Sequence, residues 1–163
     1  MESNYLLELK LQVLREFQDM FPGAHVGGSI GLLIHGINVG RDLSKSDLDI
    51  TVPEEIDIYS MPRSTQGSEG CDFDYQITVD RGPFSGYAKI DVRICPEPSF
   101  IILSYKGDEY NVSLLRDILF WKKKYADNGV QKHRDDLVCI DTGIRPSIIH
   151  TPSSIWNDLP FKD

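Results

Sequence analysis

Hydrophobic positions near the start of the chain recur with the period of a helix. Between residues 4 and 19, three leucines and a phenylalanine follow helical spacing, and polar residues such as Lys10 occupy the positions between them. Pro22, followed by a glycine, ends this pattern. The spacing predicts an amphipathic helix over 4–19, followed by a very short strand at 24–26.

A second helix and a strand follow. Apolar residues recur at helical spacing from 30 to 37, and Ser29 stands where a side chain can cap the start of that helix. Residues 47–52 alternate between polar and apolar, which is typical of a half-buried strand, and Pro53 ends the run. Residues 53–70 have little pattern and are predicted to form a loop.

The middle of the chain has the two-residue period of β-strands. Apolar and polar residues alternate over 73–79 and again over 87–94. The glycine- and proline-containing connection at 82–86 predicts that these two strands pair as a hairpin. The apolar run at 100–105 fits either a strand or a helix.

Helical spacing returns in the last third of the chain. It predicts a helix over 114–125 that Gly129 ends, and a further short helix over 131–140. Residues 141–163 contain three prolines and are predicted to be an irregular tail packed on the same domain. With 163 residues, the chain is expected to form one domain over 1–140. We predict an α/β (α+β) fold, a short mixed β-sheet with helices packed on one face.

Composition restricts the possible partners and the location. The formal net charge of −8 argues against a broad nucleic-acid or anionic-membrane surface, although one phosphorylated ligand could still bind locally. The three cysteines are far apart and include no CxxC pair, so a reducing compartment is expected. Neither a secretory signal nor a membrane-spanning run is evident, which predicts a cytoplasmic protein without membrane contact.

Three aspartates are the candidate metal ligands. Asp47 and Asp49 flank one leucine on a predicted strand, so both carboxylates project to the same face, about 7 Å apart. Asp91 lies in the middle of a later predicted strand, and it comes within reach if the two strands are neighbours. Such a group suits Mg²⁺ or Mn²⁺ and can hold two ions for phosphoryl or nucleotidyl transfer. The alternative for each aspartate is an ordinary solvated position on the polar face of a strand.

The second candidate element is the turn Gly27-Gly28-Ser29 between a strand and a helix. Glycines allow backbone N–H groups to approach a phosphate closely, and a helix N-terminus favours negative charge. The Ser29 hydroxyl can add a further hydrogen bond. An ordinary turn with a helix cap would explain the same three residues equally well.

In combination these motifs resemble the signature of the polymerase-β-like nucleotidyltransferase superfamily. That signature is a GG[ST] turn, a DxD on the next strand and a third acidic residue on a later strand. The segment from Arg41 to Asp49 is also similar to the Arg-x-Ser-x-Asp-x-Asp segment of AbiEii-type toxins, with one extra residue on each side of Ser44. The stretch from 131 to 137, QKHRDDL, resembles the Lys-Asp-x-x-Asp-Leu motif of many members.

The resemblance implies a nucleotidyltransferase fold and activity. It implies that Asp47, Asp49 and Asp91 are catalytic metal ligands and that Lys132, or Lys122 in the preceding helix, contacts the triphosphate of an NTP. The expected reaction transfers an NMP from the NTP to an acceptor hydroxyl or phosphate and releases pyrophosphate.

The acceptor and two other functions stay open. The toxin-like segment favours a tRNA 3′ end, whereas other relatives modify proteins or small molecules. A DxD sugar transferase is one alternative, although such enzymes do not require the glycine turn. A catalytically inactive nucleotide-binding or interaction module of the same fold is the other.

Overall fold

The computed structural model describes residues 2–57, 64–69, 71, 73–81, 84–96 and 99–142. The helices are α1 (Glu2–Met20), α2 (Gly28–Ile34), α3 (Leu115–Asp127) and α4 (Gln131–Thr142). The strands are β1 (His25–Gly27), β2 (Leu48–Val52), β3 (Ser64–Gln66), β4 (Tyr75–Arg81), β5 (Phe84–Ile94), β6 (Phe100–Tyr105) and β7 (Asp108–Ser113). The predicted tail lies almost entirely outside the described residues.

All seven strands form one mixed sheet, in the order β3-β4-β5-β2-β1-β7-β6. The pairs β2–β5 and β1–β7 are parallel, and the other neighbours are antiparallel. Parallel pairing of β2 and β5 brings together two segments that are about forty residues apart in the chain. The predicted α+β class with a mixed sheet is confirmed.

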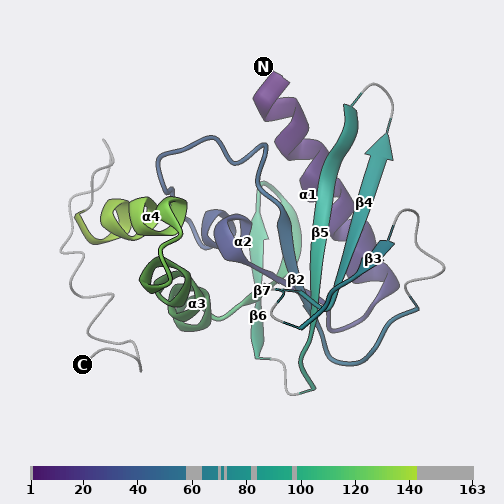
Figure 1. Ribbon diagram of the computed structural model, residues 1–163. Coiled ribbons are helices and arrows are strands. Elements are labelled where there is room, and N and C mark those ends of the chain that lie inside the picture. Colours follow the sequence, from purple (N-terminus) through teal and green to yellow (C-terminus); the bar gives the residue numbers. More distant parts are fainter. Residues whose placement is uncertain are drawn as a thin grey trace.

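The sheet has an apolar face and a polar face. Leu48, Ile50, Ile90 and Val92 alternate along β2 and β5 and are fully buried. The apolar stripe of α1 belongs to the same hydrophobic core. In Figure 1, α1 crosses behind β4 and β5, whereas α2, α3 and α4 lie together to the left of the sheet. Alternation therefore leaves the remaining side chains of these strands for the opposite face.

Most of the predicted elements are present, and two strands are additional. The predicted hairpin is β4–β5, and the ambiguous run at 100–105 is the strand β6. β3 lies inside the predicted loop, and β7 follows β6 after a tight turn in which Lys106 and Gly107 both have positive φ. Among the described residues, no helix is long and apolar enough to cross a bilayer.

Candidate functional site

The candidate residues meet on the polar face of the three central strands. Gly27 on β1 is the register partner of Asp49 on β2, and Asp49 is in turn the partner of Asp91 on β5. Register partners on neighbouring strands project to the same face, about 4.8 Å apart. The two strands are neighbours, so the condition under which Asp91 comes within reach of the DxD pair is met.

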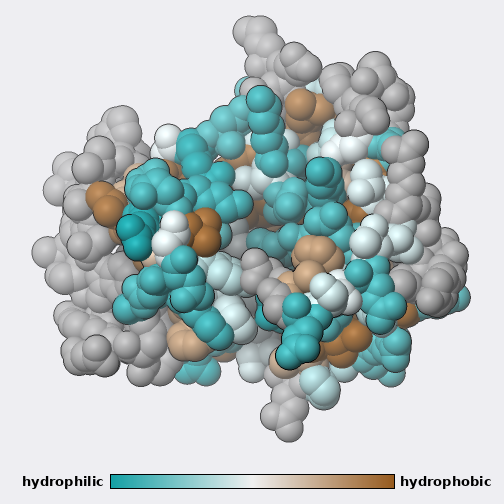
Figure 2. Space-filling view, viewed as in Figure 1, coloured by the Kyte–Doolittle hydropathy of each residue, from teal (hydrophilic) through white to brown (hydrophobic). Residues whose placement is uncertain are grey.

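These side chains line a cavity of about 390 Å³ between the sheet and the α3–α4 pair. Figure 2 shows hydrophilic side chains gathered around the hollow at the centre of this face. All eight residues selected from the sequence line the cavity: Gly27, Gly28, Ser29, Asp47, Asp49, Asp91, Lys122 and Lys132. The volume is in the range of small-molecule sites.

Gly28 allows the backbone to approach Asp49 very closely. Its φ is 61°, a region that other residues rarely adopt, and a Cβ at this position would lie 2.0 Å from Asp49 Oδ2. Any side chain here would have to displace the carboxylate. The second glycine of the turn is therefore explained by its contact with Asp49, before any ligand is considered.

Asp49 has an unusual electrostatic environment. The side chain is open to solvent in the cavity, but the surrounding protein disfavours its charge, and the carboxylates of Asp91 and Asp47 add to this effect. Together they raise the pKa of Asp49 to about 7, although Lys122 and Lys132 oppose the shift. Three carboxylates on one cavity floor repel one another, and a bound divalent cation would relieve this repulsion.

We expect Asp49→Asn to stabilise the protein at alkaline pH in metal-free buffer. Because folding raises the pKa of Asp49, the folded state binds more protons than the unfolded state between about pH 4 and 7, so this group lowers stability as pH rises through that window. Since solvent reaches the carboxylate, we expect about 1 kcal/mol rather than the full shift, or a Tm gain of roughly 2–4 °C at pH 8. Thermal unfolding at pH 5 and pH 8 with EDTA measures it, and an equal gain at both pH values would contradict it.

The donor set fits Mg²⁺ or Mn²⁺ by its chemistry. Asp47, Asp49 and Asp91 supply hard carboxylate oxygens, the ligands these ions prefer. Within the part of the chain that the structure describes, no three His, Cys, Asp or Glu side chains are already arranged to hold a metal ion. Substrate phosphates and water usually complete such sites.

The Ser29 side chain was expected to be able to cap α2, but it does not do so. Gly27 is the residue at the N-cap, and it makes no side-chain cap hydrogen bond. Instead, Ser29 Oγ accepts hydrogen bonds from Arg41 Nη2 at 2.8 Å and Lys122 Nζ at 2.9 Å. A hydroxyl that binds two cationic groups is fixed in place at the start of the helix, facing the cavity.

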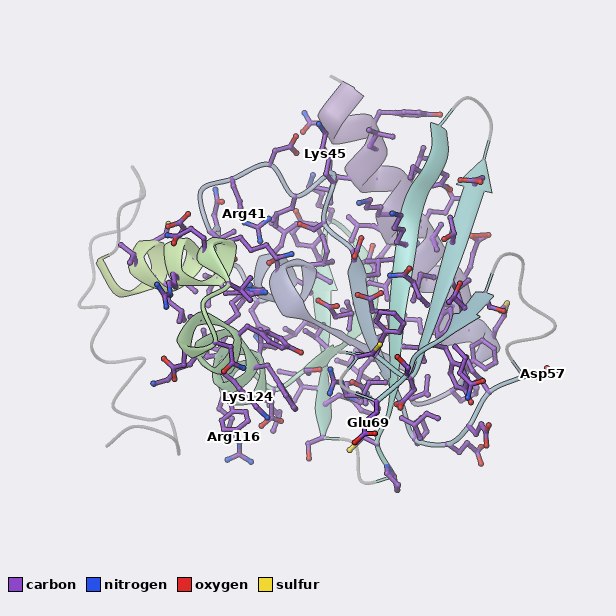
Figure 3. All side chains as sticks on the ribbon, in the orientation of Figure 1. Arg41, Lys45, Asp57, Glu69, Arg116 and Lys124 are labelled. Atoms are coloured by element: carbon purple, nitrogen blue, oxygen red, sulfur yellow. The ribbon has the colours of Figure 1, made fainter. Side chains whose placement is uncertain are left out.

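A buried carboxylate organises these two cations. Asp136, only 1% exposed, accepts two hydrogen bonds from Arg41 and one from Lys122, all 2.9 Å long. Figure 3 shows Arg41 on the loop between α2 and β2, on the side of α4. The hydrogen bonds and charges of Arg41 and Lys122 keep the pKa of Asp136 below its usual value despite burial. Asp136 therefore connects α4 and α3 to the glycine turn.

The two candidate phosphate-binding lysines differ in their surroundings. Lys122 is buried, and its Nζ also lies 3.3 Å from His133 Nδ1, so its three donors are all directed at protein atoms. Lys132 is exposed at the cavity and makes no hydrogen bond or ion pair to another described residue. Lys122 thus positions the turn, and Lys132 is the available cation.

Sequence reasoning missed three residues that position the site. Asp136 lies in the QKHRDDL stretch, but the sequence assigned it no role. It stands one helical turn before the buried Ile140, and a charged residue on an apolar stripe is the signal that could have identified it. Gln76 donates to Asp91 Oδ1 at 2.8 Å. Lys10 was expected on the polar face of its helix, but it is buried, and its Nζ donates to the carbonyl of Ser46.

Lys10 supports the segment that carries the DxD motif. Burial lowers the pKa of Lys10 to about 8, while the nearby carboxylates of Asp47 and Asp42 act in the opposite direction. Its ammonium group is held under the chain that leads into β2, immediately before Asp47. The first helix therefore contributes to the site as well as to the core.

The chain matches no protein-family model, no curated protein and no solved structure. The resemblance of its motifs to a superfamily therefore stays a prediction. The functional argument depends on the geometry and the charge distribution of the cavity.

Proposed function

We propose that the protein is a metal-dependent nucleotidyltransferase that moves an NMP from an NTP to an acceptor and releases pyrophosphate. The observation that carries this proposal is the register in which Gly27, Asp49 and Asp91 lie in line across three strands. This register puts a glycine turn and carboxylates at the floor of one cavity, with cationic side chains on its wall. A phosphate grip beside acidic metal ligands is the arrangement that nucleotidyl transfer requires.

Asp47, Asp49 and Asp91 would hold the Mg²⁺ or Mn²⁺. When bound, the ion would offset the charge of the carboxylates and of the phosphate oxygens. The backbone N–H groups at Gly28 and Ser29 would bind the β- and γ-phosphates at the start of α2. Lys132 would add a charge-assisted hydrogen bond to the same phosphates.

Asp91 is the proposed general base. The acceptor oxygen forms a bond to the α-phosphorus, the bond from that phosphorus to the bridging oxygen breaks, and pyrophosphate leaves with the electron pair. The proton of the acceptor passes to the Asp91 carboxylate, which the hydrogen bond from Gln76 orients. The cations near Ser29 stabilise the negative charge that develops on the pyrophosphate.

The acceptor class is proposed from charge and from the motif resemblance. A net charge of −8 does not favour a long nucleic-acid groove, so a local contact with one group, such as a tRNA 3′ end, a protein hydroxyl or a small molecule, is the proposal. All three cysteines are thiols rather than disulfides, which agrees with the proposed cytoplasmic location.

The direct test is incubation with each α-³²P-labelled NTP, Mg²⁺ and a cell lysate, followed by separation of RNA, protein and small molecules. Label in one fraction, together with pyrophosphate release, is the expected result. Nucleotide binding without pyrophosphate release would favour an inactive module instead. Binding of nucleotide sugars but not NTPs would favour a sugar transferase.

We expect Lys132→Ala to raise the Kd for Mg-NTP about tenfold, because it removes one charge-assisted hydrogen bond to phosphate. Titration calorimetry measures the Kd. Stability should not change, since Lys132 is exposed and makes no hydrogen bond or ion pair to another described residue. Lys123→Ala, an exposed lysine paired with Asp127 on α3, is the matched control and should bind like wild type. Equal affinities for both variants would contradict the assignment of Lys132.

A further inference from the structure

The cavity extends to both sides of the aspartate row. Ser46 and Asp47 lie just before β2, and Thr51 follows Asp49 on the same face of the sheet, about 7 Å further along the strand. Thr51 is the register partner of His25 on β1. The side chains of these residues therefore define two ends of one cavity, with the candidate catalytic carboxylates between them.

The first end is cationic. Arg41 donates to Ser46 Oγ at 3.2 Å and lies beside Ser29 and Lys122, and Lys132 lines the same region near His133. These three cations, Arg41, Lys122 and Lys132, outnumber the two carboxylates at this end, the buried Asp136 and the cavity-lining Asp47. A triphosphate would bind at this end, where the positive charge exceeds the negative.

The second end has no surplus of positive charge. It is lined by His25, Thr51, Ser113 and Asp117. Burial lowers the pKa of His25, and the nearby charge of Asp117 opposes this shift without reversing it. Arg93 is the register partner of Thr51 on β5. Its guanidinium group lies over the Trp121 ring, 4.6 Å from the ring centroid, and donates a hydrogen bond to the Tyr125 hydroxyl. A polyphosphate would be repelled here by Asp117, so the nucleoside part of an NTP would lie at this end.

Two groups at the second end are hydrogen-bond acceptors. His25 Nδ1 lies 3.0 Å from the carbonyl of Gly23, and because a carbonyl only accepts, Nδ1 carries the proton. Burial lowers the pKa of His25, so the ring is neutral and Nε2 is an acceptor. The Asp117 carboxylate has no hydrogen-bond or ion-pair partner among the residues that the structure describes.

The orientation of His25 is fixed by its neighbours. The imidazole is 3% exposed and stacks on the ring of Phe100, with centroids 5.0 Å apart and the planes 20° apart. Asp117 stands in the first turn of α3, and that helix also supplies Trp121 and Tyr125 to the cavity wall. An acceptor pair on rigid elements, next to an aromatic wall, suits a flat ligand with N–H donors on its edge.

We propose that His25 and Asp117 receive the nucleobase and select bases that carry an exocyclic amino group, as in ATP, CTP and GTP, over uracil. This inference rests on the proposed function, because it assumes that an NTP occupies the cavity. An exocyclic amino group donates to Asp117 and to His25 Nε2, whereas uracil presents carbonyl oxygens at the corresponding edge. The Ser113 and Thr51 hydroxyls can donate or accept, so they do not decide the selection.

The test is calorimetric binding of the four Mg-NTPs to the wild type, Asp117→Asn and Asp127→Asn. In the wild type, the amino-bearing NTPs are expected to bind about tenfold more tightly than UTP. Asp117→Asn is isosteric and adds an amide donor, so it should weaken their binding and improve that of UTP. Asp127→Asn, an exposed position on the same helix, is the matched control and should retain the wild-type order.

The possible outcomes separate the two proposals. Equal Kd values for all four NTPs in the wild type would overturn the base selection and leave the nucleotidyltransferase proposal standing. An unchanged preference in Asp117→Asn would overturn the role of Asp117. Failure of every NTP to bind to the folded wild type would overturn the proposed function itself, and the base selection with it.

Discussion

Replacing Asp49 or Asp91 with asparagine is expected to reduce Mg²⁺-dependent transfer from NTP to below about one hundredth of the wild-type rate. Loss of a residue that only supports a metal ligand costs 10- to 100-fold, so loss of a ligand itself should cost more. The fold should persist, because both side chains face the cavity and asparagine has the same shape. Release of pyrophosphate and incorporation of label measure the rate, and circular dichroism measures the fold.

A carboxylate outside the cavity provides the control for this experiment. Glu54 is exposed and lies two residues after the end of β2, so Glu54→Gln removes a nearby negative charge without touching the cavity floor. It should transfer like the wild type. If Asp49→Asn and Asp91→Asn retain near-normal rates, the assignment of these residues as metal ligands is wrong. If Glu54→Gln is equally impaired, a general loss of negative charge explains the effect instead.

Replacing Asp136 with alanine is expected to lower the free energy of unfolding by about 3–5 kcal/mol, because it leaves Arg41 and Lys122 close together without their shared counter-charge. The corresponding fall in Tm is roughly 10 °C. Thermal and urea unfolding measure both quantities. The loss should be large because the carboxylate is almost completely buried and accepts three hydrogen bonds.

Two further variants test whether the buried carboxylate is the cause. Asp135→Ala alters the neighbouring residue, an exposed aspartate that only accepts from Gln131 one turn away, and should change stability little. Lys122→Met should cost less than Asp136→Ala, because Arg41 keeps its two hydrogen bonds to Asp136. Equal stability of Asp136→Ala and Asp135→Ala would contradict the role we assign to the network.

The parts of the fold that sequence reasoning predicted are those with a strong local period. The apolar stripe of α1 and the alternation in β4 and β5 are each encoded within a few neighbouring residues. β3 was missed because its three residues are polar and become a strand only by pairing with β4. β7 is half polar, and the Lys106–Gly107 turn that starts its hairpin with β6 was the signal available for it.

The site divides in the same way. The motifs identified residues that the structure places around one cavity, since a glycine turn before a helix and carboxylates on strands are local patterns. The partners of those side chains come from distant segments, such as Arg41, ninety-five positions before Asp136. A charged residue inside an otherwise ordinary helix does not reveal its partner, so Lys10 and Asp136 could not be assigned from periodicity alone.

The sequence by itself determined the α+β class, most of the helices and strands, and eight of the residues that line the cavity. Only the tertiary structure decided that β2 lies parallel to β5, which makes Asp49 and Asp91 register partners. It also decided that the buried Lys122 donates hydrogen bonds to Ser29 and Asp136. The physical reason is the separation along the chain of the residues that determine each property. A strand or helix period is written in neighbouring residues, whereas register, burial and the pKa of a side chain depend on segments that meet only after the chain has folded.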